Sequence, residues 1–173
     1  MSTVMPAAAE LTLEQAWEAL RAVPDPEIPV ISVTELGIVR DLVLEGGRAV
    51  VTVTPTYAGC PATEVIARGI VQALRAAGAA QVEVRTRLAP AWTTDWIAPG
   101  ARERLRDYGI VPPARCTAEE QPLRWVAREA AALACPRCGS GATERLSQFG
   151  ATPCKALYRC RACREPFEYF KPH

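Results

Sequence analysis

Four apolar residues near the start of the chain recur with the spacing i, i+3, i+4, i+7, which places them on one helical face: Leu13, Ala16, Trp17 and Leu20. Thr12 followed by Gln15 has the pattern of a capping box, so we expect the helix to begin there. The segment Pro24-Asp25-Pro26 must lie beyond its end, because each proline removes a backbone donor and restricts the residue before it.

Two β-branched segments come next, at residues 35–45 and 48–54, and only Gly46-Gly47 separates them. A two-glycine connection between such segments predicts a tight hairpin. Residues 61–77 carry apolar side chains at helical spacing, with a proline suited to the first turn and a glycine after the last. Residues 81–88 alternate apolar and polar side chains, which is typical of a strand with one solvated face.

A short charged helix is expected between Pro99 and Gly109. The order helix, strand, strand, helix, strand, helix predicts a small α/β domain with a mixed sheet, over residues 1–111. Its second helix can make a right-handed connection between the second and third strands. Residues 112–130 are expected to form a linker, and residues 131–173 a cysteine-rich C-terminal domain. Residues 123–134 fit either a helix or a strand.

The overall composition restricts the class of protein. About half of the 173 residues are hydrophobic (49%), so the chain can bury a core, and the net charge of +1 selects neither nucleic acid nor a membrane as partner. No apolar stretch is long enough to span a bilayer, and the N-terminus lacks the pattern of a signal peptide. We therefore expect a cytoplasmic protein, in which cysteine pairs indicate metal or redox chemistry more often than disulfides.

The tail contains two Cys-x-x-Cys pairs, Cys135 with Cys138 and Cys160 with Cys163. Two such pairs supply a tetrahedral set of four thiolates, and a segment of this size needs a metal to stabilise its small core. The pattern predicts a four-cysteine zinc ribbon, with iron or an iron–sulfur cluster as the alternative occupant. Cys154 is expected to be a packed thiol rather than a fifth ligand, and nucleic-acid binding is not expected.

Cys60 stands alone between an extended segment and the expected helix at residues 61–77. Because it precedes Pro61, its backbone is biased towards the conformation of an N-cap residue, where helix amides and the helix dipole favour a thiolate. A buried, inert thiol is the alternative. The one histidine of the chain is His173, the last residue, so hydrolysis by a Cys–His or Ser–His pair is not expected.

Three motifs together resemble the metal–sulfur (iron–sulfur) cluster assembly domain family. They are the loop Asp25-Pro26-Glu27-Ile28, which we call the DPE loop, the segment SVTELGIVR at residues 32–40, and the segment TPTYAGCP at residues 54–61. With the tail CPRCGS…CKALYRCRACREPFEYFKPH, the chain is similar to one branch of that family, the accessory subunits of phenylacetate-CoA oxygenases. Glu35 stands where many relatives outside this branch have aspartate.

The resemblance implies a maturation role, in which Cys60 is the reactive or ligand residue for a transient iron–sulfur cluster or iron. It implies supporting roles for Asp25, Glu27, Thr54 and Thr56 around Cys60. The implied client is the multicomponent phenylacetyl-CoA epoxidase, which has a di-iron oxygenase subunit and an iron–sulfur reductase subunit. Because one thiolate is too few for a stable cluster, a homodimer or a ligand from the client is expected.

Two other functions fit the same residues. The chain can be a zinc-ribbon scaffold or adaptor that bridges oxygenase subunits without cluster chemistry. It can also be a thiol enzyme with Cys60 as nucleophile, although the sequence has no internal histidine and no phosphate-binding motif of the GxxxxGK[ST] type.

Overall fold

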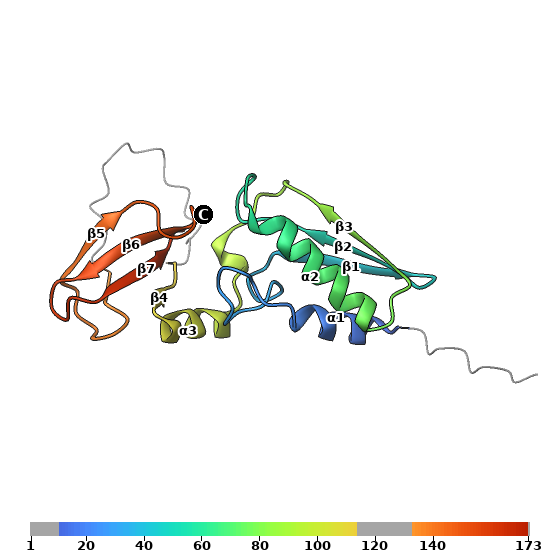
Figure 1. Ribbon diagram of the computed structural model, residues 1–173, viewed down its shortest axis with the longest axis horizontal. Coiled ribbons are helices and arrows are strands. Elements are labelled where there is room, and N and C mark those ends of the chain that lie inside the picture. Colours follow the sequence, from blue (N-terminus) through green and yellow to red (C-terminus); the bar gives the residue numbers. More distant parts are fainter. Residues whose placement is uncertain (1–10, 114–132, 173) are drawn as a thin grey trace, which may run out of the picture.

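The computed structural model describes residues 11–113 and 133–172 as an α/β domain beside a small β-sheet domain (Figure 1). The predicted fold class, a small mixed-sheet α/β domain followed by a four-cysteine ribbon, is confirmed. None of the described helices has both the length and the apolar character needed to cross a membrane. The domain boundaries predicted from the sequence stay a prediction.

The first helix, α1 (Leu13–Arg21), begins with the predicted capping box. The side chain of Thr12 accepts a hydrogen bond from the Gln15 amide, and the Gln15 side chain accepts one from the Thr12 amide. Both contacts satisfy amides that a helix N-terminus would otherwise leave without partners. The buried side chains of this helix, Ala16 and Leu20, face the domain core.

The α/β sheet has the order β1-β2-β3, formed by β1 (Val39–Glu45), β2 (Arg48–Val53) and β3 (Gln81–Thr86). β1 and β2 are antiparallel, as the hairpin prediction requires, and β2 and β3 are parallel. Alternate residues of β2 are buried, so one face of this strand packs on the core.

The prediction that the first strand starts at residue 35 was wrong, since β1 begins only at Val39. A turn occupies the preceding residues: the Glu35 carboxylate accepts hydrogen bonds from the Ser32 amide and hydroxyl. Gly37 then adopts a positive φ of 75°. A Cβ on Gly37 would lie 2.6 Å from Cβ of Trp96, so both the backbone angle and the close approach require glycine.

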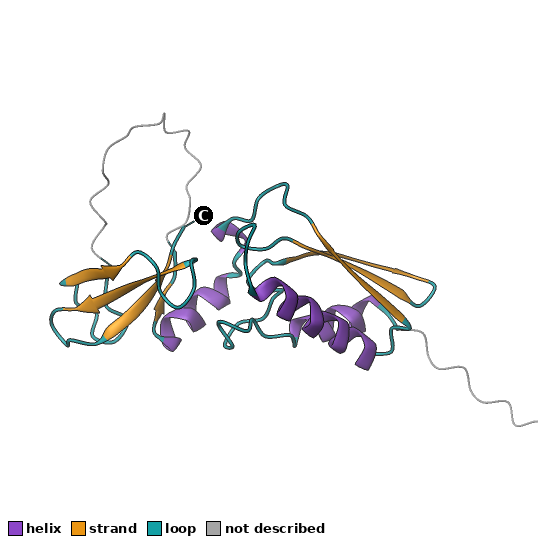
Figure 2. Ribbon diagram, turned by 45° about the horizontal axis from the view of Figure 1, so that its top comes forward, coloured by secondary structure: helices purple, strands orange, loops and turns teal. Residues whose placement is uncertain are grey.

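The second helix, α2 (Ala62–Ala76), links β2 to β3 and contacts β3. Its buried residues Ile66, Ile70 and Leu74 lie at four-residue spacing and contribute to the core. α1 and α2 lie on the same face of the sheet, which gives the domain two layers (Figure 2). The helix predicted over residues 61–77 is therefore confirmed to within one residue at each end.

The end of the α/β domain leads directly into the second sheet. A short 3-10 helix, η1 (Thr94–Trp96), precedes α3 (Pro99–Tyr108), whose end is marked by Gly109 with a φ of 98°. The next two residues form β4 (Ile110–Val111), which pairs in parallel with the last strand of the ribbon, β7. The sequence did not predict this strand, because two residues are too few to show a pattern.

The ribbon sheet has the order β4-β7-β6-β5. Its other strands are β5 (Thr143–Ser147), β6 (Lys155–Cys160) and β7 (Pro166–Phe170), in the segments where the sequence predicted strands. Tyr158 and Phe167 stack with ring centroids 5.7 Å apart and form part of a small core. Most of the segment 123–134, left open between helix and strand, and the linker beyond Pro113 lie outside the described residues.

The two domains share buried side chains. Phe170 and Cys154 belong to the ribbon by sequence, yet both are buried in the hydrophobic cluster of the α/β domain. The ring of Phe170 lies 5.9 Å from the ring of Trp92, centroid to centroid. Trp92 in turn donates a hydrogen bond of 3.0 Å to the carbonyl of Leu36. The last strand of the ribbon is therefore packed onto the region around the DPE loop.

Candidate functional site

The four predicted zinc ligands, Cys135, Cys138, Cys160 and Cys163, converge at one end of the ribbon, where their sulfur atoms all lie within 4.8 Å of one another. The Sγ atoms of Cys135 and Cys163 are 3.7 Å apart, and those of Cys138 and Cys160 are 3.6 Å apart. A tetrahedral zinc with Zn–S bonds of about 2.3 Å places its sulfurs about 3.8 Å apart. The four thiols therefore fit a Zn²⁺ ion.

Local backbone geometry prepares this arrangement. The amide of Gly139 donates to the carbonyl of Cys135 at 2.8 Å, and Gly139 takes a φ of 74°. The amide of Cys135 then donates to the carbonyl of Ser140 at 2.9 Å, which closes the first knuckle. Only a residue without a Cβ adopts this turn readily, so the glycine after the first pair positions two sulfurs on the same side.

The second knuckle directs amides at its sulfurs. Hydrogen bonds from the Cys163 amide, and less strongly from the Ala162 amide, lower the pKa of Cys160 to about 6. At Cys163, a backbone hydrogen bond from Glu165 lowers the pKa, but burial and the three neighbouring sulfurs outweigh it and raise the value to about 12. Without a metal the four sulfurs cannot all ionise, whereas a divalent cation removes that repulsion.

A separate cavity of about 30 Å³ lies where the α/β domain meets the ribbon, and Cys60 lines it. Cys60 is half-buried and is not the N-cap residue that the sequence suggested. That position belongs to Pro61, and the Thr63 amide donates to the backbone carbonyl of Cys60 at 3.2 Å. Proline itself takes the helical conformation here, so Cys60 is displaced one residue from the helix start.

Asp25 lines the same cavity and is 5% exposed. Its Oδ1 accepts hydrogen bonds from the amides of Glu27 and Ile28, both at 2.9 Å, which fold the DPE loop around the carboxyl group. Burial nevertheless raises the pKa of Asp25, and the neighbouring Glu27 carboxylate adds to the shift. Burial disfavours the charged form of a carboxyl group, and buried carboxyl groups with a raised pKa are typical of ligands and functional groups.

The other predicted supporting residues divide between two places. Glu27, which is exposed, and Thr56, which is buried, line the cavity with Cys60. Thr54 does not: it borders a neighbouring hollow with Leu88 and Trp92. Its Oγ1 atom is buried and has no hydrogen-bond partner among the described residues. The grouping of Asp25, Glu27 and Thr56 with Cys60 supports their predicted role, which stays a prediction.

Tyr57 and Cys154 also line this cavity, and neither was predicted as a site residue. Burial raises the pKa of Tyr57 to about 12, and the charge of Cys60 and a hydrogen bond between the two side chains contribute to the shift. The sequence offered one sign that Tyr57 belongs to the site, namely its position three residues before Cys60. It offered none for Cys154. Cys154 comes from the turn before β6, so its arrival here depends on the packing of the ribbon.

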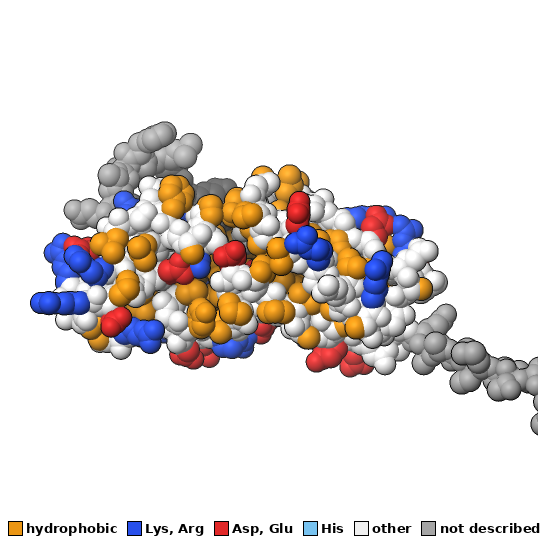
Figure 3. All heavy atoms as spheres, in the orientation of Figure 1, with side chains coloured by type: hydrophobic (Ala, Val, Ile, Leu, Met, Phe, Trp, Pro, Cys, Tyr) orange, Lys and Arg blue, Asp and Glu red, His pale blue; other side chains and the backbone are white. Residues whose placement is uncertain are grey.

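Many apolar side chains lie around the junction on the face drawn in Figure 3. Figure 3 shows hydrophobic side chains gathered over the middle of the molecule, whereas Lys and Arg side chains concentrate towards its two ends. The cavity itself is walled by apolar side chains, among them Ile28, Ile66 and Phe170. A polar group inside it is therefore poorly hydrated, which strengthens its interaction with a bound ion or with a neighbouring charge.

Comparison with known proteins matches both domains. Residues 13–85 match the family described as iron-sulfur cluster assembly protein, and residues 119–171 match the PaaD zinc beta ribbon domain. The α/β domain resembles the crystal structure of a domain of unknown function, DUF59, from Bacillus anthracis. That structure is 27% identical with a TM-score of 0.50, and the match covers 53% of this chain and 89% of that one.

A curated protein is similar over nearly the whole chain. This relative, a putative 1,2-phenylacetyl-CoA epoxidase subunit of Escherichia coli (strain K12), is 50% identical over 161 residues, 92% of each chain. The fold, the two family matches and the four-cysteine cluster thus define an iron–sulfur assembly domain joined to a zinc ribbon. The chain belongs to the family of this epoxidase subunit, and the resemblance inferred from the motifs is confirmed.

Proposed function

We propose that the chain is a non-catalytic accessory factor for the multicomponent phenylacetyl-CoA epoxidase of aerobic phenylacetate degradation. In this role it assists assembly or delivery of an iron–sulfur or iron centre through Cys60. The observation that carries the proposal is the position of Cys60, in a cavity beside the buried carboxyl group of Asp25 and within the segment that matches the assembly family. The likeness to an epoxidase subunit supplies the client system.

Each residue at the cavity has a distinct part in this function. The Cys60 sulfur binds the iron cargo, and Tyr57 lines the cavity beside it. Asp25 supplies negative charge that attracts a cation, while the exposed Glu27 lies where cargo enters. Thr56 and the apolar walls limit the access of water, so the bound iron meets few competing ligands.

The ribbon acts in a structural role. Zn²⁺ at Cys135, Cys138, Cys160 and Cys163 fixes the two knuckles, and β7 carries Phe170 into the core beside the cavity. The ribbon therefore makes the α/β domain more rigid, and it offers a second surface for docking the client. The client is the di-iron oxygenase subunit or the iron–sulfur reductase subunit of the epoxidase, and we place both partners in the cytoplasm.

The test uses cells that lack this gene but express the epoxidase components. Restoring the wild-type chain should restore both the iron content of the purified components and the consumption of phenylacetyl-CoA. Cys60→Ala should restore neither beyond about one tenth of the wild-type level, whereas Cys116→Ala, the matched removal of a thiol elsewhere, should behave as wild type. Full activity and full iron occupancy with Cys60→Ala would contradict the proposal.

The same experiment separates the two competing functions. An adaptor without cluster chemistry predicts that Cys60→Ala is silent, while deletion of residues 131–173 abolishes the epoxidase complex. A thiol enzyme predicts that alkylation of Cys60 stops a turnover reaction yet leaves the iron content of the client unchanged. Iron occupancy is therefore the readout that decides between them.

A further inference from the structure

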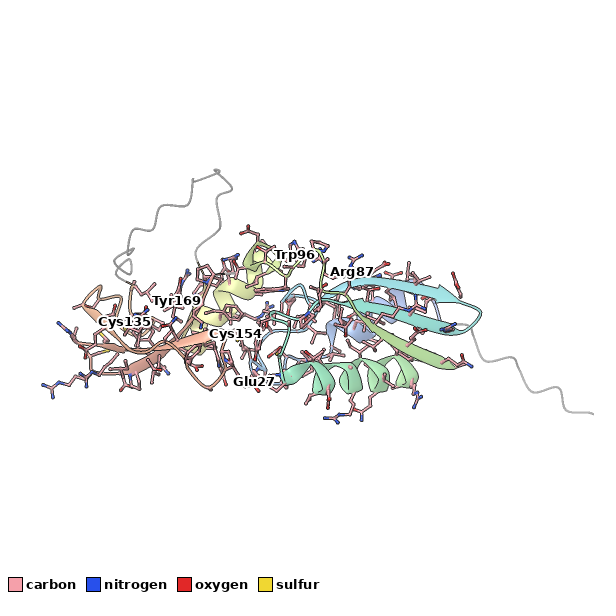
Figure 4. The ribbon with its side chains drawn as sticks, turned by 90° about the horizontal axis from the view of Figure 1, so that it is seen from above. Glu27, Arg87, Trp96, Cys135, Cys154 and Tyr169 are labelled. Carbon is pink, nitrogen blue, oxygen red and sulfur yellow. The ribbon has the colours of Figure 1, made fainter. Side chains whose placement is uncertain are left out.

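The ribbon places a second thiol at the Cys60 cavity. Cys154 is 9% exposed and is buried with the core of the α/β domain, and it is not one of the four clustered zinc ligands. Figure 4 shows Cys154 on the side of the ribbon that faces the α/β domain, with Cys135 farther away. Cys154 is therefore separate from the zinc site and belongs to the domain junction.

Several contacts hold Cys154 in this position. The hydroxyl of Thr152 lies 3.1 Å from its sulfur, and the amide of Lys171 donates to its carbonyl at 2.9 Å. The next residue, Lys155, is 3% exposed, and its ammonium group lies 2.6 Å from the Glu168 carboxylate on β7. A turn anchored at both ends in this way presents its thiol in a defined direction.

The cavity brings together two thiols, those of Cys60 and Cys154, and two carboxyl groups, those of the buried Asp25 and the exposed Glu27. Its volume of about 30 Å³ exceeds the roughly 10–15 Å³ that one water molecule requires. The space therefore suits a single metal ion, provided that the lining side chains move towards it, and it is small for a cluster of four irons. Neutral hydroxyls such as those of Thr56 and Tyr57 also line the cavity, but thiols and a carboxylate bind such a cation better, and Asp25 carries the buried carboxyl group.

The ionisable groups of the cavity also influence one another. Burial is the main cause that raises the pKa of the Cys154 thiol, and negative charge at Cys60 raises it further. The pKa of Tyr57 responds to both sulfurs in the same direction. These effects act across the domain junction, where all three side chains line one cavity.

We propose that Cys60, Cys154 and Asp25 form a second metal site in this chain, which binds a single thiophilic divalent cation of the Fe²⁺ type. Binding releases the two thiol protons to solvent, so that the two thiolates and the Asp25 carboxylate place three negative charges around the two positive charges of the ion. Thiolate ligands favour such a cation over Mg²⁺ or Ca²⁺, which prefer oxygen. An exchangeable solvent or client ligand completes the coordination.

This site differs from the zinc site in a way that suits cargo. The four ribbon sulfurs already lie within 4.8 Å of one another, and no such preassembled group includes Cys60 and Cys154 among the described residues. The second site must close around its ion and has fewer protein ligands. It therefore holds the ion less firmly than the ribbon holds zinc, and can release it to a client.

The inference rests on the proposed function and deepens it, because it names the second ligand that a lone Cys60 lacks. The chain itself then supplies two thiols, and a homodimer is not required to hold the iron. The ribbon consequently has a direct part in the site, in addition to making the α/β domain more rigid.

The test titrates the full-length, reduced, zinc-loaded chain with Fe²⁺ alone under anaerobic conditions and measures bound iron after equilibrium dialysis. Wild type should bind one Fe²⁺ in addition to one zinc. Cys60→Ser and Cys154→Ser should each weaken iron binding at least tenfold, and Asp25→Asn should weaken it less. Cys116→Ser, the matched removal of a thiol outside the described residues, should bind iron as wild type does.

The outcomes distinguish this inference from the function on which it rests. Wild-type iron affinity in Cys154→Ser would overturn the second site, and the proposed function would survive if Cys60→Ser alone lost iron. Wild-type affinity in both variants would contradict both proposals. A thiol-bridging reagent tests the wild-type chain without any substitution. Mass spectrometry should find Cys60 linked to Cys154 before iron is added and not after, and absence of this link would overturn the proposal.

Discussion

Cys60, beside the start of α2, and Cys154, in the turn before β6, line one cavity at the junction of the two domains. The residues that bring them together are structural ones, since Phe170 of the ribbon packs against Trp92 of the α/β domain at 5.9 Å. The assembly domain and the zinc ribbon are thus coupled through a shared core. This coupling has consequences for stability as well as for function.

Loss of zinc should destabilise both domains. Cys135→Ser removes one of the four zinc ligands, and a structural zinc site contributes on the order of 10 kcal/mol to the folding of a small domain. We expect elemental analysis to show no tightly bound zinc in this variant. Because Phe170 lies in the core of the α/β domain, the thermal unfolding of that domain should also shift to lower temperature.

Cys154→Ser serves as the control for this experiment, since Cys154 is not one of the four clustered ligands. It should retain one zinc per chain. Loss of zinc in Cys154→Ser, or full retention in Cys135→Ser, would contradict the assignment of the four-cysteine zinc site.

Gly37→Ala should lower the free energy of unfolding by about 3 kcal/mol, because two penalties add. The positive φ of 75° is unfavourable for alanine, and the new Cβ would lie 2.6 Å from Cβ of Trp96. Denaturant unfolding measures the change. Gly59→Ala is the control, since a Cβ at Gly59 meets no atom within 4 Å, and a loss equal to that of Gly37→Ala would refute the explanation.

Asp25→Asn should stabilise the metal-free cavity at neutral pH. The folded-state pKa of Asp25 is raised above 3.8, mainly by burial, so the folded chain binds its proton more tightly than the unfolded chain does. The Asp25 carboxyl group therefore lowers the free energy of unfolding as pH rises from about 3.8 through its folded-state pKa. The loss is about 1.4 kcal/mol for each unit by which the folded-state pKa exceeds the unfolded-state pKa. Asparagine keeps the Oδ1 acceptor and avoids this penalty.

Urea unfolding of the wild type and Asp25→Asn at a series of pH values measures this effect. The two chains should be of similar stability at about pH 3, and Asp25→Asn should be the more stable at about pH 7. A difference that does not change with pH would show that the pKa of Asp25 is not raised in the folded chain.

Thr54→Val should raise the free energy of unfolding by about 1 kcal/mol, because it replaces a buried hydroxyl that has no partner among the described residues. Thr52→Val, at a half-buried position of β2, is the matched control and should change stability little. If Thr54→Val destabilises the chain, the Thr54 hydroxyl has a hydrogen-bond partner and the explanation is wrong. If the variant keeps its stability but fails to mature the client, the Thr54 hydroxyl has a role in function.

The sequence predicted the parts of the fold that depend on local pattern. The capping box at Thr12, the hairpin at Gly46-Gly47 and the face of α2 with Ile66 and Ile70 all follow from spacing over a few residues. The strand before Val39 was mispredicted because the apolar residues there fill a turn, which the Glu35 carboxylate and Gly37 stabilise. Apolar content alone does not distinguish a strand from a turn whose apolar side chains are buried.

The candidate site was predictable only in part. Cysteine spacing predicted the four thiols that cluster in the ribbon, since each pair folds locally into a knuckle. The arrival of Cys154 beside Cys60 depends on the contact between Phe170 and Trp92, which joins segments far apart in the sequence. Likewise, the N-cap position of α2 belongs to Pro61 and not to Cys60. Residue preferences alone did not distinguish these two neighbouring positions.

The most direct test of the central claim measures iron transfer between purified proteins. The chain is loaded with zinc and Fe²⁺, freed of unbound metal and mixed with the iron-free epoxidase components, whose iron content is then determined. The account predicts that wild type and Cys116→Ser transfer iron to one component, and that Cys60→Ser transfers less than about a tenth as much. Equal transfer by Cys60→Ser, or no transfer by the wild type, would contradict it.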